Sequence, residues 1–203
     1  LRNAPQLVLD RVQFRLENSF GHHRFGLKGT PPAELAAPLD LRGDLEFGSM
    51  QDWQDAQGQL FVRLDYADVA AWREWLPLPA QIETGTGAMR LWFKFAQREA
   101  REVIADVELA GVKAKLGDDL PGIELAHVSG RVGTRKSGAR REVFARALAF
   151  TTMTGERLDP VQFMLSVREG SGDRLASAEI EFDQLQLAPL VALAAHLPPP
   201  DRG

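Results

Sequence analysis

The stretch Met89-Arg-Leu-Trp-Phe-Lys-Phe-Ala96 decides the fold of this chain, because apolar and polar side chains alternate along it. An alternation with a period of two places successive side chains on opposite faces of a β-strand. After a reversal near residues 97–101, the alternation resumes in Glu102-Val-Ile-Ala-Asp-Val-Glu-Leu109. The two stretches predict a long antiparallel hairpin with one apolar face and one charged face.

The same alternation runs through most of the chain. It predicts further strands over residues 12–16, 25–27, 39–47, 60–64, 112–116, 123–125, 128–132, 143–150, 161–167 and 175–187. Gly43 is expected at a bulge or bend, since an isolated glycine in a strand often marks one. Strands of ten or more residues exceed the usual length of about five or six. We therefore predict a mainly β fold, in which long antiparallel strands form a curved, groove-forming sheet. An immunoglobulin-like sandwich is a poorer match, because its strands are shorter and its turns more regular.

A phrase that occurs twice indicates a modular organisation. A strand at 60–64 is followed by a short apolar helix at 68–76 and by Leu76-Pro-Leu-Pro79, and a strand at 180–185 is followed by a helix at 188–196 and by Leu197-Pro-Pro-Pro200. Self-similarity of this kind is typical of repeat proteins. It predicts two short helices at repeat junctions and two β sections, 1–79 and 80–203. Because the chain begins at Leu1, we expect it to be a fragment of a longer protein.

Composition narrows the classes of function. A chain of 203 residues can bury a sizeable core, and its net charge of −4 argues against a general nucleic-acid binder. The absence of cysteine excludes disulfides, cysteine–zinc sites and thiol catalysis. The sequence contains no apolar run of about 18 residues.

The sequence contains no complete catalytic, nucleotide-binding or metal-binding motif. The stretch Gly85-Thr-Gly-Ala-Met-Arg90 lacks the third glycine of a dinucleotide fingerprint and precedes a strand, so it predicts a turn. His22 and His23 are adjacent, which on a strand sends them to opposite faces and prevents them from sharing a metal ion. Neither Gly-x-Ser-x-Gly nor Ser-x-x-Lys occurs. We expect neither enzymatic activity nor a cofactor or metal.

Two other clusters leave alternatives open. Arg135, Lys136, Arg140 and Arg141 surround a predicted hairpin tip. They form either a charged loop that discourages edge pairing or a surface for an anionic partner such as lipid headgroups.

Trp72 and Trp75 lie three residues apart on the first predicted helix, and therefore on one side of it. Their expected role is to plug this helix against the sheet. The alternative is that the helix caps or gates an apolar groove.

Three segments of the chain resemble a known family. The segment 58–72, the phrase Trp75-Leu-Pro-Leu-Pro79 and the segment 85–92 resemble the YhdP branch of the AsmA-like envelope proteins of Gram-negative bacteria. The stretches Leu185-Gln-Leu-Ala-Pro189 and Leu197-Pro-Pro-Pro200 are similar to the inter-repeat junction of that family. These motifs are structural rather than catalytic, and the similarity covers most of the chain from about residue 7 onward.

The resemblance implies a function. Members of this branch are bridge-like lipid-transfer proteins, anchored in the inner membrane and extending through the periplasm. Stacked curved sheets form their long apolar groove, which carries phospholipids between the inner and outer membranes. This chain would be a middle section, with phospholipid acyl chains and neighbouring repeats as its partners and with no nucleic acid. The motifs fix no functional residue.

Candidate residues for the floor of such a groove are the apolar side chains of the central strands: Met89, Leu91, Phe93, Phe95, Val103, Val107, Leu109, Val161, Phe163, Leu165 and Val167. On the residues alone, these side chains could equally form a closed core. The competing function is a structural envelope scaffold that binds protein partners by strand addition to its sheet edges. Exposed edges would also allow the fragment to dimerise. An enzyme acting on lipid or glycan is disfavoured by the empty motif search.

Overall fold

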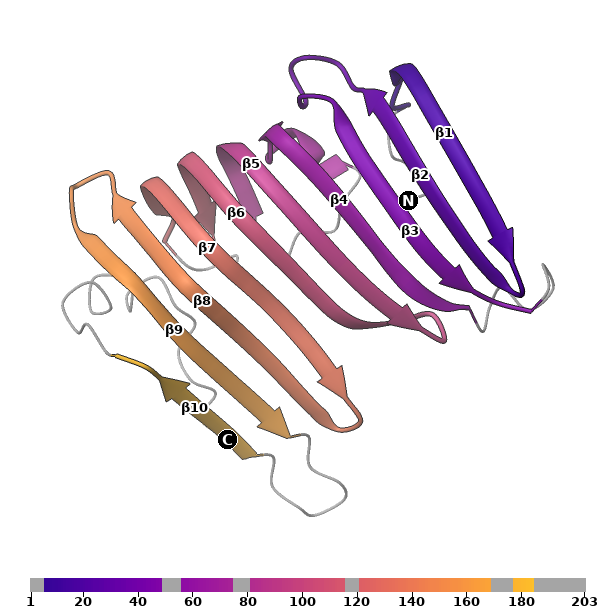
Figure 1. Ribbon diagram of the computed structural model, residues 1–203. Helices are drawn as coiled ribbons and strands as arrows, with labels where there is room; N and C mark the ends of the chain where they lie inside the picture. The colour runs from indigo at the N-terminus through magenta and orange to yellow at the C-terminus, as the bar shows by residue number, and fades with distance from the viewer. Residues whose placement is uncertain (1–5, 49–55, 75–80, 116–120, 169–176, 185–203) are drawn as a thin grey trace.

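The computed structural model describes residues 6–48, 56–74, 81–115, 121–168 and 177–184. Within these residues the chain forms ten antiparallel strands, and each strand pairs with the next in the sequence (Figure 1). The strands are β1 (Asp10–Ser19), β2 (His22–Thr30), β3 (Leu39–Glu46), β4 (Gln57–Asp68), β5 (Gln81–Ala96), β6 (Glu99–Lys115), β7 (Ile123–Ser137), β8 (Arg140–Thr152), β9 (Arg157–Arg168) and β10 (Ser177–Phe182). β1 and β10 lie at opposite edges, so the sheet is open. The predicted mainly β fold with long antiparallel strands is confirmed.

The central hairpin is formed by β5 and β6, as predicted. The two strands contain 16 and 17 residues and reverse at Gln97 and Arg98, whose φ angles are +53° and +63°. Two consecutive residues with positive φ match the right-handed twist of the strands that they join. The long alternating stretches therefore continue directly from one strand into the next.

The register aligns apolar residues into rows that cross the whole sheet. The first row is Leu16, Phe25, Gly43, Leu60, Phe93, Val103, Thr134, Val143, Leu165 and Ile180. The second row is Phe14, Leu27, Leu41, Val62, Leu91, Ala105, Val132, Ala145, Phe163 and Phe182. Neither row contains a charged residue. We call the side of the sheet that carries them the apolar face, and the other side the charged face.

A bulge preserves this separation of faces in β8. The pairing with β9 shifts between Ala145 and Leu148 and the pairing with β7 between Arg146 and Ala149, and Ala147 there has a φ of +50°. One extra residue in a strand resets the alternation by one position. As a result, Ala145 and Leu148 lie on the same face although an odd number of positions separates them.

The core lies at one end of the apolar face. Its larger cluster contains Ala36, Leu39, Leu64, Ala67, Val69, Trp72, Met89, Leu109, Val112 and Ala114, and its smaller cluster contains Phe150, Leu158 and Val161. The larger cluster includes Trp72 of η2 (Ala71–Glu74), a single 3₁₀ turn that packs against this end of the sheet. Within the described residues the first predicted helix is represented by this 3₁₀ turn, since Asp68 still belongs to β4, and the second, at 188–196, lies outside the described residues.

Two local expectations are wrong. Gly43 pairs in register with Phe25 and Leu60 without a bulge, and a Cβ on this glycine would lie 2.2 Å from the ring of Phe25. The glycine is needed because the phenylalanine ring covers its backbone. The stretch Gly85–Arg90 is not a turn but part of β5, where Gly87 pairs with Leu109.

The two predicted sections share one sheet. β4, from the first section, pairs with β5, from the second, over Gln57–Leu64 and again at Ala67 and Asp68. The division into repeat sections 1–79 and 80–203 stays a prediction, since the sheet continues without a gap across the boundary.

Candidate functional site

All eleven candidate floor residues lie on the apolar face. Met89, Leu109 and Val161 are buried in the core clusters, with exposed fractions of 6–7%. The other eight are only partly buried: Leu91, Phe93, Phe95, Val103, Val107, Phe163, Leu165 and Val167. The face therefore has an end that the chain itself covers and a more open part toward the hairpin tips.

The open part is large enough for acyl chains. Ten strands at about 4.8 Å spacing give a width of about 43 Å, and the two rows lie about 7 Å apart along the strands. One leaflet of a bilayer has a hydrocarbon depth of about 15 Å, half of its core thickness. Among the described residues no large side chain is completely buried, and Phe14 and Ile180 at the two edges are 61% and 55% exposed.

Trp72 occupies the position expected of a plug. Its side chain is 8% exposed within the larger core cluster, and its Nε1 donates a hydrogen bond to the Leu35 carbonyl at 3.2 Å. This contact ties η2 to the segment before β3 at the covered end of the apolar face. The alternative role, in which this turn caps or gates an apolar groove, stays a prediction. Trp75 lies outside the described residues.

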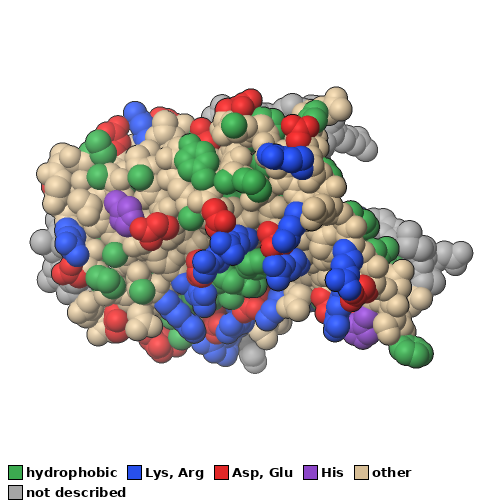
Figure 2. All heavy atoms as spheres, turned by 45° about the horizontal axis from the view of Figure 1, so that its top comes forward, with side chains coloured by type: hydrophobic (Ala, Val, Ile, Leu, Met, Phe, Trp, Pro, Cys, Tyr) green, Lys and Arg blue, Asp and Glu red, His purple; other side chains and the backbone are tan. Residues whose placement is uncertain are grey.

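The charged face carries a ladder of ion pairs. Glu102 of β6 accepts from Lys94 of β5 at 2.7 Å and from Arg135 of β7 at 2.7 Å. Glu142 of β8 continues the ladder, 3.7 Å from Arg135 and 3.0 Å from Arg140. Opposite charges directly across neighbouring strands stabilise the pairing. Figure 2 shows Lys and Arg side chains gathered around hydrophobic ones near the middle of this view.

Glu102 is the buried centre of the ladder, with an exposed fraction of 8%. Hydrogen bonds from Lys94 and Arg135 hold the pKa of Glu102 below its ordinary value, although burial acts against them. A lowered pKa in the folded state means that ionised Glu102 stabilises the fold. This contribution is present above the ordinary glutamate pKa and is lost as the pH falls through the folded value.

We expect Glu102→Gln to lower the free energy of unfolding by about 1–2 kcal/mol at neutral pH, because hydrogen bonds to a charged group are lost. The difference from wild type should shrink as the pH falls below the ordinary pKa of about 4.5. Urea unfolding at a series of pH values measures it, with the exposed Glu179→Gln as control. A difference that is constant with pH would contradict the assigned role.

An apolar stripe on the charged face was missed by the sequence reasoning. The register aligns Phe61, Trp92, Ile104, Phe144 and Met164 in one row between the charged rows. Arginines cover its aromatic rings: the guanidinium of Arg131 lies 5.3 Å from the Trp92 ring, and that of Arg146 lies 5.6 Å from Phe144. The sequence held one signal for this stripe: Trp92 is an apolar residue between Arg90 and Lys94 on the same face of β5.

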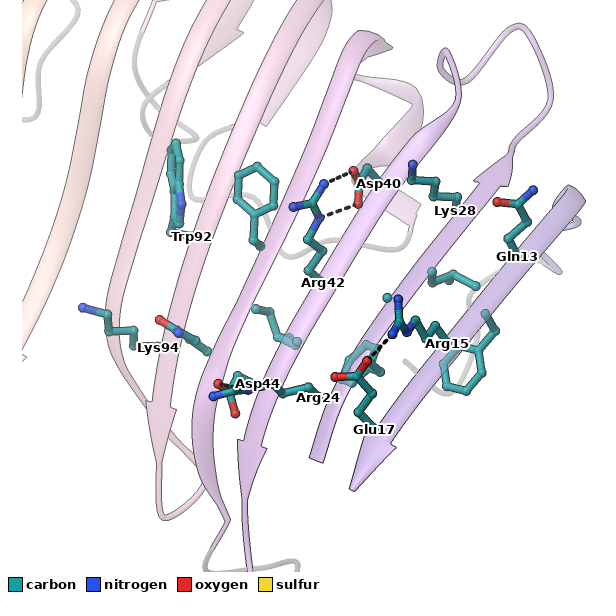
Figure 3. Close-up of a pocket in the computed structure, with 18 residues that line it drawn as sticks. Gln13, Arg15, Glu17, Arg24, Lys28, Asp40, Arg42, Asp44, Trp92 and Lys94 are labelled. Carbon is teal, nitrogen blue, oxygen red and sulfur yellow. Dashed lines mark hydrogen bonds and ion pairs between the residues drawn. The ribbon is translucent and has the colours of Figure 1, made fainter. Parts of the chain in front are cut away.

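A cavity of about 830 Å³ lies on the charged face over β1–β5. Figure 3 labels ten of its lining residues, most of them charged, from Gln13, Arg15 and Glu17 on β1 to Trp92 and Lys94 on β5. Most of these charges are paired: Arg42 contacts Asp40 at 2.7 Å, and Arg24 contacts Asp44 at 3.1 Å. None of the eleven candidate floor residues lines this cavity, although Phe14, Phe25, Leu27 and Leu60 of the apolar rows contribute to its lining.

The basic hairpin tip is divided between the two faces. Arg135 and Arg140 belong to the ladder on the charged face. Lys136 and Arg141 follow them by one position on their strands and pair with each other, so the register assigns them to the opposite face. The expectation that this tip discourages edge pairing is wrong, because β7 and β8 are interior strands. The expectation of an anionic partner stays open.

A comparison with protein-family models matches residues 2–202 to the family described as YhdP protein. The chain belongs to the YhdP family. The resemblance predicted from the junction phrases and the segment 85–92 is thereby confirmed. No curated protein and no solved structure matches the chain.

Two further features of this YhdP-family chain bear on its site. The described residues contain no group of three or more His, Asp or Glu that could hold a metal ion. No helix in the described ranges is long and apolar enough to cross a membrane.

Proposed function

We propose that this YhdP-family chain is a segment of a periplasmic protein that transports phospholipid between the inner and outer membranes. Its apolar face holds the acyl chains, and its role is binding rather than catalysis. One observation carries the proposal: two rows without a charged residue cross all ten strands, while the core clusters cover only one end of that face.

The physical chemistry of the two faces supports this function. Each CH₂ group moved from water onto an apolar surface gains about 0.8 kcal/mol, so acyl chains need few polar contacts to be held. An unpaired charge in such a surface would cost several kcal/mol, and the two rows contain none. The ion pairs of the charged face, such as Lys94–Glu102, keep the other side of the sheet hydrated.

The edges of the sheet support a place within a longer protein. Among the described residues, β1 and β10 each pair with a strand on one side only. Neighbouring repeats that add strands to these edges would extend both apolar rows in register, since side chains continue to alternate. The groove for acyl chains would then run across several repeats.

The alternative function is a scaffold that binds proteins by strand addition. All ten residues of β1 are exposed, and an exposed edge strand offers unpaired backbone groups to another chain. The same edge would allow two copies of this chain to dimerise.

Photo-cross-linking from the two faces tests the proposal. A benzophenone side chain in the rows of the apolar face should capture phospholipid, and the same group in the row that contains Phe61 should not. If a benzophenone side chain on β1 captures protein and the apolar rows capture no phospholipid, the scaffold function would be favoured instead.

A further inference from the structure

The charged face carries a row of cations beside the apolar stripe that contains Trp92. On each strand from β1 to β8 this row lies two residues from the row of the stripe, on the side away from Glu102. Its members are Gln13, Lys28, Asp40, Arg63, Arg90, Asp106, Arg131 and Arg146. We call it the arginine row. Five cations against two carboxylates give it a net charge of +3, in a chain whose net charge is −4.

Two pairs of arginines in this row face each other across neighbouring strands. Arg63 pairs with Arg90, and Arg131 pairs with Arg146. Like charges directly opposite each other destabilise the pairing of strands. Carboxylates contact one arginine of each pair, Arg63 at 2.8 Å and Arg131 at 2.5 Å. An arrangement that costs stability in the chain by itself is expected at a functional surface, where a partner supplies negative charge.

The stripe holds two of these arginines over aromatic rings. The guanidinium of Arg131 lies 5.3 Å from the centre of the Trp92 ring, and that of Arg146 lies 5.6 Å from the centre of the Phe144 ring. A stacked guanidinium is pre-organised to bind a carboxylate with two hydrogen bonds. Aromatic residues, methionine and arginine are also enriched at protein–protein interfaces, whereas lysine is depleted there. The arginine row contains four arginines and one lysine.

The charged row on the other side of the stripe has the opposite sign. It consists of Glu17, Arg24, Asp44, Gln59, Lys94, Glu102, Arg135, Glu142, Ser166 and Glu179. Five carboxylates against three cations give it a net charge of −2. The two charged rows are about 14 Å apart along the strands. An anionic membrane surface would meet both rows and be repelled by the second, whereas a narrow segment can lie over the stripe and the arginine row alone.

We propose that the arginine row and the apolar stripe together dock an acidic segment of another protein. The segment presents carboxylates to the arginines and apolar side chains to the stripe. The stripe crosses β4–β9, about 24 Å at a strand spacing of about 4.8 Å, so an extended segment of about eight residues covers it. Alternate side chains of an extended segment point to opposite sides, so a sequence that alternates acidic and apolar residues reaches both rows. The partner and the acyl chains would occupy opposite faces of the sheet.

Three fluorescently labelled octapeptides test the proposal by fluorescence anisotropy with the whole chain. The first alternates Asp with Leu, the second Asp with Ser, and the third Lys with Leu. Wild type should bind the Asp-Leu peptide most tightly, and less tightly as the ionic strength rises. Equal binding of the Asp-Ser peptide would mean a site for anions alone. Equal binding of the Lys-Leu peptide would mean binding to any apolar surface of the chain. Either result would overturn the proposal.

The variant Arg90→Gln/Arg146→Gln removes one arginine from each opposed pair. It should bind the Asp-Leu peptide about tenfold more weakly. Its free energy of unfolding, measured in urea, should not fall, because the repulsion between like charges is relieved. The matched control Arg15→Gln/Arg24→Gln makes the same change in net charge at exposed positions of β1 and β2 and should bind like wild type. An equal loss in both variants, or unchanged binding in the first, would overturn the docking surface.

Two further measurements address the stripe and the class of partner. Ile104→Thr keeps a β-branched side chain but removes apolar surface from the stripe, so it should weaken the Asp-Leu peptide about threefold and leave the Asp-Ser peptide unchanged. Equal effects on the two peptides would contradict a role for the stripe. Vesicles of phosphatidylglycerol should bind wild type and the Arg90/Arg146 variant alike. Vesicle binding that is lost in this variant would assign the surface to a membrane instead of a protein.

Discussion

Phe93→Asp should reduce the phospholipid bound by this chain at least about tenfold. Phe93 lies at the centre of the first apolar row, between Leu60 and Val103, and is stacked on Phe95 at 5.8 Å. A carboxylate there would have to lose its hydration under an acyl chain, which costs several kcal/mol, and 1.4 kcal/mol already corresponds to a factor of ten. Native mass spectrometry of protein purified without detergent, with extraction of its lipid, measures the loss.

Gln59→Asp is the matched control for this variant. Gln59 lies on β4, next to Leu60 in sequence, and it pairs with Lys94 on the charged face. The new carboxylate is therefore exposed to water and close to a cation. Circular dichroism should show folded protein in both variants. Equal lipid content in the two would mean that the apolar face is not where acyl chains are held.

Gly87→Ala should destabilise the sheet by about 3 kcal/mol or more. Gly87 has a φ of +153°, and a Cβ at this position would lie 2.0 Å from the carbonyl oxygen of Glu108 and 2.9 Å from the Cα of Leu109. Both neighbours are backbone atoms of β6, so the strands must separate to make room. Strain of this kind belongs to the few mechanisms that produce large losses from one substitution.

The comparison variant is Gly26→Ala, because a Cβ at Gly26 would have no atom within 4 Å. Alanine there should leave the unfolding free energy within about 1 kcal/mol of wild type. Urea unfolding of both variants measures the contrast. Similar stability of the two alanine variants would show that β5 and β6 do not approach each other as closely at Gly87 as the structure has them.

The faces of individual strands were predictable from the sequence because alternation is local. The stretches 89–96 and 102–109 identified the apolar side chains of β5 and β6, and the structure pairs Phe93 with Val103 as an antiparallel hairpin requires. The tryptophan on the first helix, Trp72, was likewise predicted to pack against the sheet, since an apolar side of a short helix has nowhere else to go.

What could not be predicted depends on partners distant in the sequence. Gly43 looked like a bend, but it is a flat strand position that the Phe25 ring covers from the next strand. The row from Phe61 to Met164 joins one residue from each of several strands, so no single stretch reveals it. The bulge at Ala147 decides which residues follow onto the apolar face, and alanine gives no sequence signal for it.

The separation of Lys136 from Arg135, by contrast, follows from local alternation along β7. In the sequence the four cations around the hairpin tip form one cluster, whereas alternation sends neighbours to opposite faces of the sheet. The acidic partners, two carboxylates of β6, agree with this division: Glu102 contacts Arg135 and Glu99 contacts Lys136.

Site-specific photo-cross-linking tests the central claim most directly, namely that the apolar face of this sheet holds phospholipid acyl chains. Benzophenone side chains would be placed at Leu60, Val103 and Leu165 in the first apolar row, and at Phe61, Ile104 and Met164 on the charged face of the same strands. After irradiation of cells that produce these variants, mass spectrometry identifies what each position has captured. We expect phospholipid adducts from the three apolar-face positions and none from the other three. Adducts distributed equally over both faces, or only to protein, would contradict the account.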